Sequence, residues 1–280
     1  MTVKIIADSL GDVPADVVKE LGITVIPIQV LFGTECFRDG VDLTSEQFYE
    51  KLVRSKVLPT TAVPSLGAFA EIYDQVAKNA DDILVLTISH KLSATYDTAV
   101  HAVEIMKKKA RVKVINTTKV LMAEGLIVIE AAKAAKSGAS MDELIRIVEQ
   151  AMPRIDIRMA FDTLEYLKRG GRIGAAQAFL GSMLKVNPVL TLKDGEAHPV
   201  ARERSRTKAM DHLYNFAISY SKVDAFAIED ATTPVEADAL AERIKAKFPG
   251  KPMYRSKVSP VLGAHVGPSV VCITVLGDKK

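Results

Sequence analysis

The chain has 280 residues, of which 48% are hydrophobic and 25% are charged. This composition excludes a disordered chain, and the length allows a sizeable core divided between two lobes. The formal net charge is only +3, because 37 basic residues nearly balance 34 acidic ones, and this gives no electrostatic case for a dedicated nucleic-acid binder.

No segment reads as a targeting or membrane-spanning element. Residues 1–8 read as a strand entering a turn and lack the long apolar region of a signal peptide. The most apolar later stretches, 125–135 and 270–276, are short or interrupted by charge. We therefore expect a cytoplasmic protein. Cys36 and Cys272 are too far apart for a CxxC motif and too few for a disulfide framework.

The first half of the chain alternates strand-like and helix-like segments. Apolar runs typical of strands occupy residues 3–7, 25–31, 83–88 and 112–115. Helical patterns occupy residues 44–52, 66–77, 95–109 and 123–136, and a further helix begins after Ser140. Capping-box sequences open two of these helices, at Thr44 and at Ser140. Strands alternating with helices predict a mainly parallel sheet.

The second half has a different rhythm. Strand patterns occur at residues 157–161, 189–192, 197–202, 225–229 and 270–276. Asp194-Gly195 is the strongest hairpin signal in the sequence. Residues 175–184 read as a buried helix, and Thr233 reads as the N-cap of a helix that ends at Lys247. We predict an α+β lobe with a partly antiparallel sheet, and a boundary near Pro153 that gives lobes 1–153 and 154–280.

Common catalytic signatures are missing from the sequence. There is no GxxxxGK[ST] phosphate loop, no strand-borne GxGxxG, no HExxH and no GxSxG. The five histidines lack metal-ligand spacing, and no pair of carboxylates stands out for acid–base chemistry. We therefore predict neither a cofactor nor a metal site, and the pattern weighs against a common hydrolase, kinase or dehydrogenase.

Polar clusters follow strands or precede helices at three places. They are Asp8-Ser9, residues 60–65 and residues 89–96. Ligands of parallel sheets bind at the carboxyl ends of the strands, and the N-termini of helices favour anions. Hydroxyl groups there would suit one carboxylate or phosphate. Serine and threonine at helix starts are most often simple caps, so these clusters alone support no more than an anion site.

Four segments share their order and spacing with the motifs of one known family. The segments are Thr60-Thr61-Ala62-Val63-Pro64-Ser65, Leu92-Ser93-Ala94-Thr95-Tyr96, residues 164–173 and residues 265–269. They resemble the T-T-S-Q-P-S, L-S-G-T-Y, L-x-Y-L-x-x-G-G-R-I and H-x-G-P-G patterns of the DegV family of fatty-acid-binding proteins. The resemblance covers essentially the whole chain, and the initial Asp8-Ser9 fits it as well.

This resemblance implies a two-lobed α/β fold of the DegV type. The first lobe would hold the mainly parallel sheet and the second a mixed, partly antiparallel one. A long-chain fatty acid would lie between the lobes, with its carboxylate held by Thr61 and Ser93 and with His265 nearby. The acyl chain would run into an apolar tunnel in the second lobe. Family members of known role deliver the fatty acid to a separate kinase, which makes an acyl phosphate for phospholipid synthesis, so the chain itself would not be an enzyme.

The resemblance also suggests further site residues. Arg172 could approach the head group or a partner's phosphate. We expect the tunnel to include a set of apolar residues, although each could equally belong to the ordinary core: Phe161, Leu164, Phe179, Met183, Leu184 and Leu190. The chain departs from the family pattern at a few positions, which leaves the head-group geometry open: Ala62, Val63, Ala94 and Ser269.

Two other functions stay open at this point. The chain could be an enzyme that acts on a carboxylate or phosphate ligand in the same cleft. It could also be a regulatory or nucleic-acid-binding protein, which only the basic run at residues 202–208 suggests. That run is usually a solvated helix start, and it could also dock a kinase or touch an anionic membrane transiently.

Overall fold

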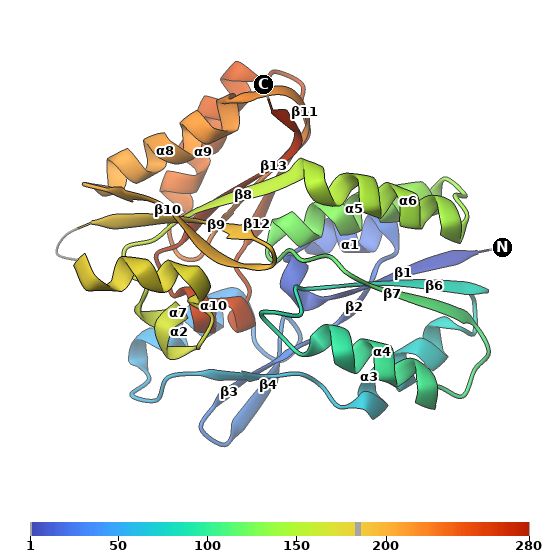
Figure 1. The fold of residues 1–280 in the computed structure, drawn as a ribbon. Coiled ribbons are helices and arrows are strands. Elements are labelled where there is room, and N and C mark those ends of the chain that lie inside the picture. The colour runs from blue at the N-terminus through green and yellow to red at the C-terminus, as the bar shows by residue number, and fades with distance from the viewer. Residues whose placement is uncertain (1, 183–185, 280) are drawn as a thin grey trace.

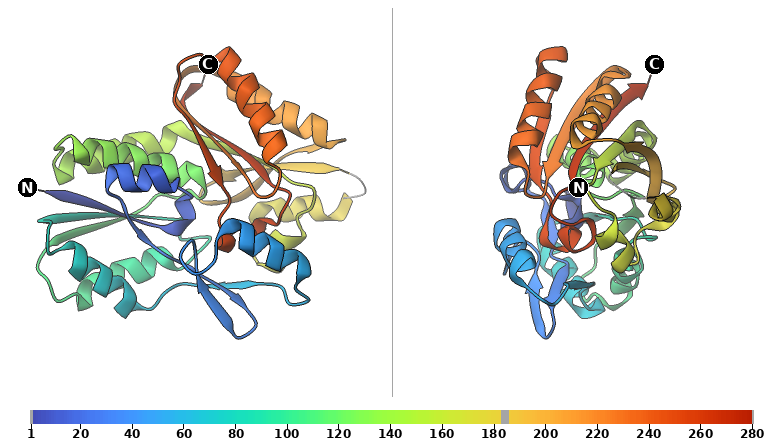
Figure 2. Two further views of the ribbon diagram at one scale, coloured as in Figure 1. Left: turned by 180° about the vertical axis from the view of Figure 1, so that it is seen from behind. Right: turned by 90° about the vertical axis from the view of Figure 1, so that its left-hand side faces the viewer.

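The computed structural model describes residues 2–182 and 186–279 of the chain. It has two lobes side by side, the first coloured blue to green and the second yellow to red (Figures 1 and 2). Two of the residues predicted to line the tunnel, Met183 and Leu184, lie outside the described residues. The predicted two-lobed α/β architecture is confirmed.

The first lobe is built on a four-stranded parallel sheet with strand order β2-β1-β6-β7. Its strands are β1 (Val3–Asp8), β2 (Thr24–Ile26), β6 (Asp82–Thr87) and β7 (Arg111–Asn116). Helices cover both faces (Figure 1), namely α1 (Ala15–Leu21), α5 (Met122–Lys136) and α6 (Met141–Ala151) on one and α3 (Leu66–Val76) and α4 (Thr95–Ile105) on the other. Because it is covered on both sides, β6 is buried at every position.

A second, three-stranded antiparallel sheet in this lobe was not predicted. It consists of β3 (Gln29–Phe32), β4 (Glu35–Arg38) and β5 (Thr60–Ala62), in the order β4-β3-β5, with α2 (Ser45–Arg54) between β4 and β5. The prediction of one strand over 25–31 is wrong, because the run divides at Pro27 into β2 and β3 of different sheets. Proline has no N–H and cannot continue a ladder. Thr61 lies on β5, which pairs with β3 in this second sheet.

The second lobe is built on a six-stranded sheet with order β10-β9-β8-β13-β11-β12. Its strands are β8 (Ile155–Ala160), β9 (Asn187–Lys193), β10 (Glu196–Glu203), β11 (Tyr220–Asp230), β12 (Met253–Lys257) and β13 (Val271–Lys279). All pairs are antiparallel except β11 with β12. One face packs against α8 (Arg206–Ile218) and α9 (Pro234–Lys247), and the other packs against α5 of the first lobe.

Five short helical segments complete the fold, and one of them, η2, joins the lobes. They are η1 (Ser9–Gly11), η2 (Met152–Arg154), α7 (Glu165–Arg169), η3 (Gly174–Ser182) and α10 (Pro260–Val266). Although α10 comes near the end of the chain, it packs against α2, β3 and β5 of the first lobe. The boundary proposed near Pro153 falls in η2, directly before the first strand of the six-stranded sheet, and it stays a prediction.

Local signals in the sequence had mixed outcomes. The capping boxes at Thr44 and Ser140 and the Asp194-Gly195 hairpin are confirmed. The buried helix expected at 175–184 is instead the 3₁₀ segment η3, whose described residues are mostly exposed or half-buried. It begins at Gly174, whose φ of +50° no regular α-helix contains. Thr233 lies at the start of α9, yet its side chain makes no capping hydrogen bond.

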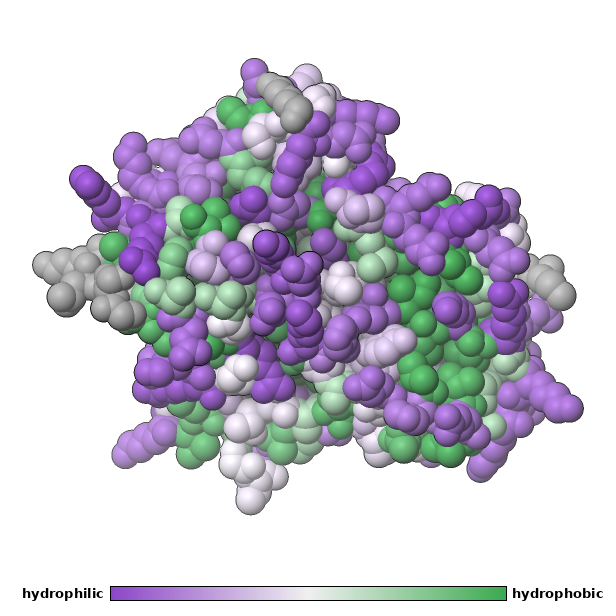
Figure 3. Space-filling view, in the orientation of Figure 1, coloured by the Kyte–Doolittle hydropathy of each residue, from purple (hydrophilic) through white to green (hydrophobic). Residues whose placement is uncertain are grey.

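The surface seen in Figure 3 is mostly hydrophilic. A hydrophobic area lies over α4 and β7 of the first lobe. Among the described residues, no helix is long and apolar enough to cross a membrane.

Candidate functional site

A cavity of about 170 Å³ lies between the two lobes. Its walls are mainly apolar and come from both lobes and from α10: Leu10, Ile28, Ala62, Val63, Ile88, Leu92, Ala94, Val120, Leu121, Met159, Phe161, Leu167, Leu192, Ala197, Val261, Leu262 and Val266. The polar residues that line it are Thr61, Ser93, Arg172 and His265. The fold therefore brings all four predicted site residues to one cavity.

The apolar walls differ from the expected tunnel. Phe161 lines the cavity, but Leu164 and Leu190 are fully buried elsewhere in the same core. Phe179 also lies outside the walls, where its ring packs under the guanidinium of Arg202. Much of the wall comes from first-lobe residues that follow strands, such as Leu10 after β1. No local pattern in the sequence indicates that these residues meet second-lobe residues.

Thr61 and His265 meet at the polar part of the cavity. Thr61 lies on β5 and His265 near the end of α10, and 2.9 Å separates Thr61 Oγ1 from His265 Nε2. Burial, together with the smaller effect of the positive charge of Arg172, lowers the pKa of His265 to about 4. The imidazole is therefore neutral at physiological pH.

An anion bound at Thr61 would fix the proton of the His265 ring on Nε2. Nδ1 is buried and has no hydrogen-bond partner among the described residues, whichever nitrogen carries the proton. Nε2 either donates to Thr61 Oγ1 or accepts from it, and an anion that accepts the Thr61 hydrogen requires Nε2 to donate. The Thr61 hydroxyl then keeps its own hydrogen free to donate to an anion. His265 thereby orients Thr61.

Two glycines allow His265 to sit where it does. A Cβ on Gly170 would lie 2.2 Å from His265 Nδ1. Gly267 has φ of +77°, and a Cβ there would lie 2.4 Å from the Tyr166 ring. Both positions need a residue without a side chain, which gives a physical reason for glycine in these two motifs.

Ser93 lies in the loop between β6 and α4, residues 89–94, which we call the serine loop. The backbone N–H groups of Leu92 and Ser93 donate to the carbonyl of Ser89, at 3.0 and 3.1 Å. Ser93 Oγ accepts from the N–H of Thr95 at 3.3 Å and lies 2.8 Å from Thr95 Oγ1. If the buried Thr95 hydroxyl donates in that pair, the hydrogen of Ser93 is free for a ligand.

Arg172 holds the serine loop against the turn at Gly170 and Gly171. Its Nε donates to the Leu92 carbonyl at 3.0 Å, and its Nη1 donates to the Gly170 carbonyl at 2.7 Å. Two of its donor groups therefore bind backbone, while its charge adds positive potential beside Thr61 and His265. The structure thus gives Arg172 a positioning role in addition to its place in the cavity wall.

A second, outer pocket of about 280 Å³ adjoins this polar group. It shares Thr61, Arg172 and His265 with the cavity. Its remaining residues are Leu58, Pro59, Thr60, Tyr166, Arg169, Gly170 and Ala264. Three of the four polar residues of the cavity are therefore also walls of a pocket that has exposed residues, such as Thr60 and Arg169, in its lining.

The Asp8-Ser9 cluster serves the fold. Asp8 accepts hydrogen bonds from the N–H groups of Leu10 and Ile88, at 2.9 and 2.8 Å, and so joins the ends of β1 and β6. Ser9 Oγ donates to Asp39 at 2.7 Å. Burial raises the pKa of Asp8 to about 7, that of Asp39 to about 6 and that of Glu229 to about 8.

Other candidate groups do not form a site. Both cysteines are free, with Cys36 exposed and Cys272 buried. Within residues 2–182 and 186–279, no group of three His, Cys, Asp or Glu could hold a metal ion. In the basic run, Arg202 donates to the Ala178 carbonyl and Arg206 pairs with Glu236, so both have structural roles.

Comparison with known proteins identifies the family. The family model described as "Uncharacterised protein, DegV family" matches residues 2–278. The chain belongs to the DegV family. A DegV domain-containing protein of Caldanaerobacter subterraneus is 34% identical over 274 residues, which cover 95% of each chain. Another, of Streptomyces coelicolor, is 34% identical with 98% of each chain covered.

Solved DegV structures share the fold along the whole chain. A DegV family protein from Thermus thermophilus, described by its fatty acid binding, is 30% identical, with 99% of this chain and 100% of that one covered and a TM-score of 0.89. DegV from Bacillus subtilis, described as a fatty acid binding protein, is 28% identical, with 99% of each chain covered and a TM-score of 0.90. The predicted family is confirmed.

Proposed function

We propose that this DegV protein binds a long-chain fatty acid in the cavity between its lobes, with the carboxylate at Thr61 and Ser93. One observation carries the proposal: only four of the described residues that line a mainly apolar cavity are polar, namely Thr61, Ser93, Arg172 and His265. Thr61 is hydrogen-bonded to His265, and Arg172 binds the carbonyl of Leu92, the residue before Ser93. A single anionic head on an apolar tail matches that distribution. The fatty acid binding of the T. thermophilus and B. subtilis proteins supports it.

The two parts of the ligand contribute differently to binding. Burial of an alkyl chain contributes about 0.8 kcal/mol per CH₂, or about 10 kcal/mol gross for a long-chain acid. Each hydrogen bond to the charged carboxylate contributes roughly 1.5–3 kcal/mol. The tail therefore dominates affinity, while Thr61 and Ser93 set the orientation of the acid.

The carboxylate would be presented to a separate fatty acid kinase. The outer pocket supports this step, because it reaches Thr61, Arg172 and His265 from the surface side. The partner would supply the nucleotide and transfer its phosphoryl group to the carboxylate, forming an acyl phosphate. Because such a kinase uses nucleotide, we expect the protein to act in the cytoplasm.

The unpaired Nδ1 of His265 argues against the alternative of an enzyme in the same cleft. A catalytic pair would need His265 to accept the proton of Thr61, with a third group orienting Nδ1. Nδ1 has no partner among the described residues, so none of them orients the ring for that role. The pair is better suited to hold an anion than to activate a nucleophile.

Denaturing extraction of the purified protein, followed by lipid mass spectrometry, tests the proposal. We expect close to one fatty acid per chain, and an empty protein that also fails to take up added fatty acid would sink the idea. Thr61→Val and Ser93→Ala should each weaken oleate binding about 10- to 100-fold, from the loss of one charge-assisted hydrogen bond. Thr60→Val is the matched control, because exposed Thr60 lines only the outer pocket.

A further inference from the structure

The end of the β9–β10 hairpin projects beyond the six-stranded sheet. β9 pairs with β8 only at Val189 and Leu190, so residues 192–197 pair with nothing but each other and form a two-stranded ribbon. The tip of this ribbon is the Asp194-Gly195 turn. A two-stranded ribbon without a third strand is at best marginally stable alone. Its position therefore depends on what it contacts.

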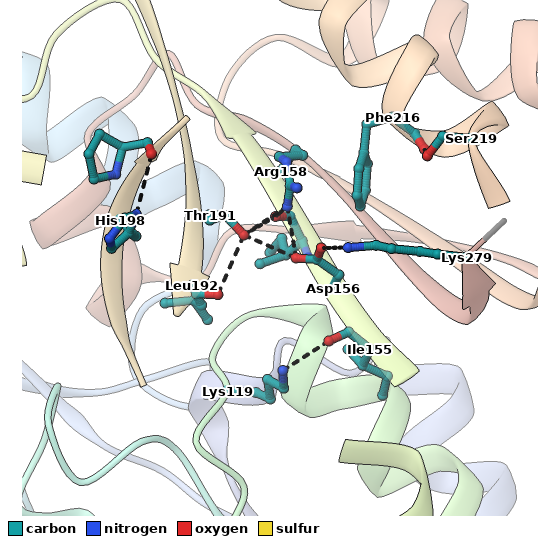
Figure 4. A network of polar contacts seen from close by, with 12 residues as sticks. Lys119, Ile155, Asp156, Arg158, Thr191, Leu192, His198, Phe216, Ser219 and Lys279 are labelled. Atoms are coloured by element: carbon teal, nitrogen blue, oxygen red, sulfur yellow. Dashed lines mark hydrogen bonds and ion pairs between the residues drawn. The ribbon is translucent and has the colours of Figure 1, made fainter. Parts of the chain in front are cut away.

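The base of the ribbon is fixed firmly at Thr191 (Figure 4). Arg158 Nη1 donates to Thr191 Oγ1 at 2.8 Å, and Thr191 Oγ1 lies 2.8 Å from the Ile157 carbonyl and 3.0 Å from Asp156 Oδ1. These groups belong to β8, at the point where its pairing with β9 ends. The hairpin is therefore held to β8 by hydrogen bonds up to Thr191, and the ribbon beyond that residue has no neighbouring strand within the described part of the chain.

The ribbon forms part of the cavity wall. Leu192, just before the turn, and Ala197, just after it, both line the cavity, as do Leu92 and Ser93 of the serine loop. On its other side the ribbon packs against η3, where a Cβ on Gly174 would lie 2.8 Å from the Ala197 carbonyl. Because η3 belongs to the second lobe as well, that contact does not attach the ribbon to the first lobe.

Two polar contacts attach the ribbon to the first lobe. Buried Ser89 donates from Oγ to the Gly195 carbonyl at 2.6 Å, and Lys91 Nζ lies 3.5 Å from Glu196 Oε1. Among the described residues, no other hydrogen bond or ion pair joins residues 192–197 to residues 2–153. Gly195 has φ of +84°, and a Cβ there would lie 2.4 Å from Ser89 Oγ, so the contact requires glycine.

We infer that the ribbon is a movable wall of the cavity, hinged at Thr191 and held shut by Ser89, and that its opening admits and releases the fatty acid. The inference rests on the proposed function. A long alkyl chain that came through the outer pocket would have to pass Thr61, Arg172 and His265 tail first. Displacement of Leu192 and Ala197 exposes the apolar walls directly, so the tail moves from solvent to apolar surface without crossing the polar group.

Hydrogen exchange of the ligand-free protein tests the hinge itself. Ser89→Ala removes the buried hydrogen bond to the Gly195 carbonyl, equivalent to roughly a fivefold change in the opening equilibrium. It also removes a longer bond, at 3.3 Å, from the Lys91 N–H within the serine loop. Exchange of the amides in residues 192–197 should accelerate by that factor, while β8 and β13 stay unchanged. Tyr73→Phe is the control, because it removes a buried hydroxyl bonded to the Ala99 carbonyl, in a part of the core separate from the one that contains Leu192 and Ala197. Equal effects of the two variants on the ribbon would overturn the inference.

Exchange of a bound fatty acid tests the route. Bound cis-parinaric acid, chased by oleate, should leave the Ser89→Ala variant about fivefold faster than the wild type, with the dissociation constant changed less than twofold, because opening speeds binding and release alike. A head-group role would raise the dissociation constant instead. A wild-type protein that binds no parinarate would refute the proposed function, whereas the hydrogen-exchange result stands or falls separately.

A covalent bridge provides the opposite perturbation. Lys91→Cys with Glu196→Cys, in a Cys36→Ser background, places two thiols where the exposed ion pair was, and a short cleavable bis-maleimide can join them. Release of parinarate should slow at least tenfold when the bridge is closed and recover when it is cleaved. Release at the wild-type rate from the bridged protein would overturn the route.

Discussion

Gly170→Ala should disturb the head-group site through His265. Gly170 has φ of −74°, which any residue adopts, so alanine adds only a methyl group. That methyl would lie 2.2 Å from Nδ1 and 3.0 Å from Cε1 of His265, and 3.1 Å from the Tyr166 carbonyl. His265 is largely buried and its other edge is bonded to Thr61. The ring must therefore move, and Thr61 loses the donor that orients it.

The size of the effect follows from the two interactions that change. Overpacking of this kind costs about 1–3 kcal/mol, and the lost Thr61–His265 hydrogen bond adds about 1 kcal/mol. The share of this free-energy cost that weakens carboxylate binding should raise the dissociation constant for oleate about 5- to 100-fold. Gly171→Ala is the matched control: its φ of +69° strains an alanine, but nothing lies within 4 Å of the added Cβ. It should reduce stability by about 1 kcal/mol and leave affinity unchanged.

Calorimetric titration with oleate and urea unfolding of both variants measure these effects. The double variant Gly170→Ala, His265→Ala tests whether the effect arises from this contact, because the added methyl group has room once the His265 ring is removed. Most of the cost of Gly170→Ala should then disappear, giving a coupling energy of at least 1 kcal/mol. If Gly170→Ala weakens binding no more than Gly171→Ala, or if its effect adds to that of His265→Ala, our account of this contact is wrong.

Two further predictions concern stability. Between pH 6.5 and 8.5 the free energy of unfolding should fall by at least about 2–3 kcal/mol, because the folded protein holds protons on Asp8 (pKa about 7) and Glu229 (pKa about 8) that the unfolded chain has released. Burial raises the pKa of Asp12 and of Glu124 well above its usual value as well, and protons held there act in the same direction. Urea titrations across this range measure the change, and stability that rises with pH would contradict it. Gly263→Ala should lower the melting temperature by several degrees, because its Cβ would lie 2.6 Å from the Phe48 ring and 2.7 Å from the Tyr49 hydroxyl, an overlap worth about 1–3 kcal/mol. An unchanged melting temperature would show that α10 shifts freely.

Features set by neighbouring residues were predictable from the sequence. The boxes at Thr44 and Ser140 depend on residues three positions apart, and the Asp194-Gly195 turn depends on two residues that accept positive φ. The division of 25–31 was missed because its apolar run continues across Pro27, and only the missing N–H of proline separates the two strands. The sequence of η3 predicts a buried helix, because its small apolar residues suit a helix core as well as they suit a 3₁₀ segment that is only partly buried.

The site itself was predictable only through its motifs. Thr61 and His265 are 204 residues apart, and nothing in either segment specifies the other. The hydrogen bond between them and the burial of Nδ1 beside Gly170 are properties of packing. The first-lobe wall was missed for the same reason, because an apolar residue such as Leu121 looks like ordinary core until the second lobe faces it.

The order of strands in the second lobe has a consequence for biosynthesis. β13, which follows the other five strands of its sheet in the chain, lies in the interior of the six-stranded sheet and is the strand that joins β8 to β11. The first lobe needs only residues up to β7 to complete its parallel sheet. A nascent chain can therefore fold its first sheet early, but until β13 has been made the second sheet exists as two unjoined parts. A product truncated before His265 would lack both this joining strand and that histidine, so such chains should neither hold ligand nor compete with the folded protein for it.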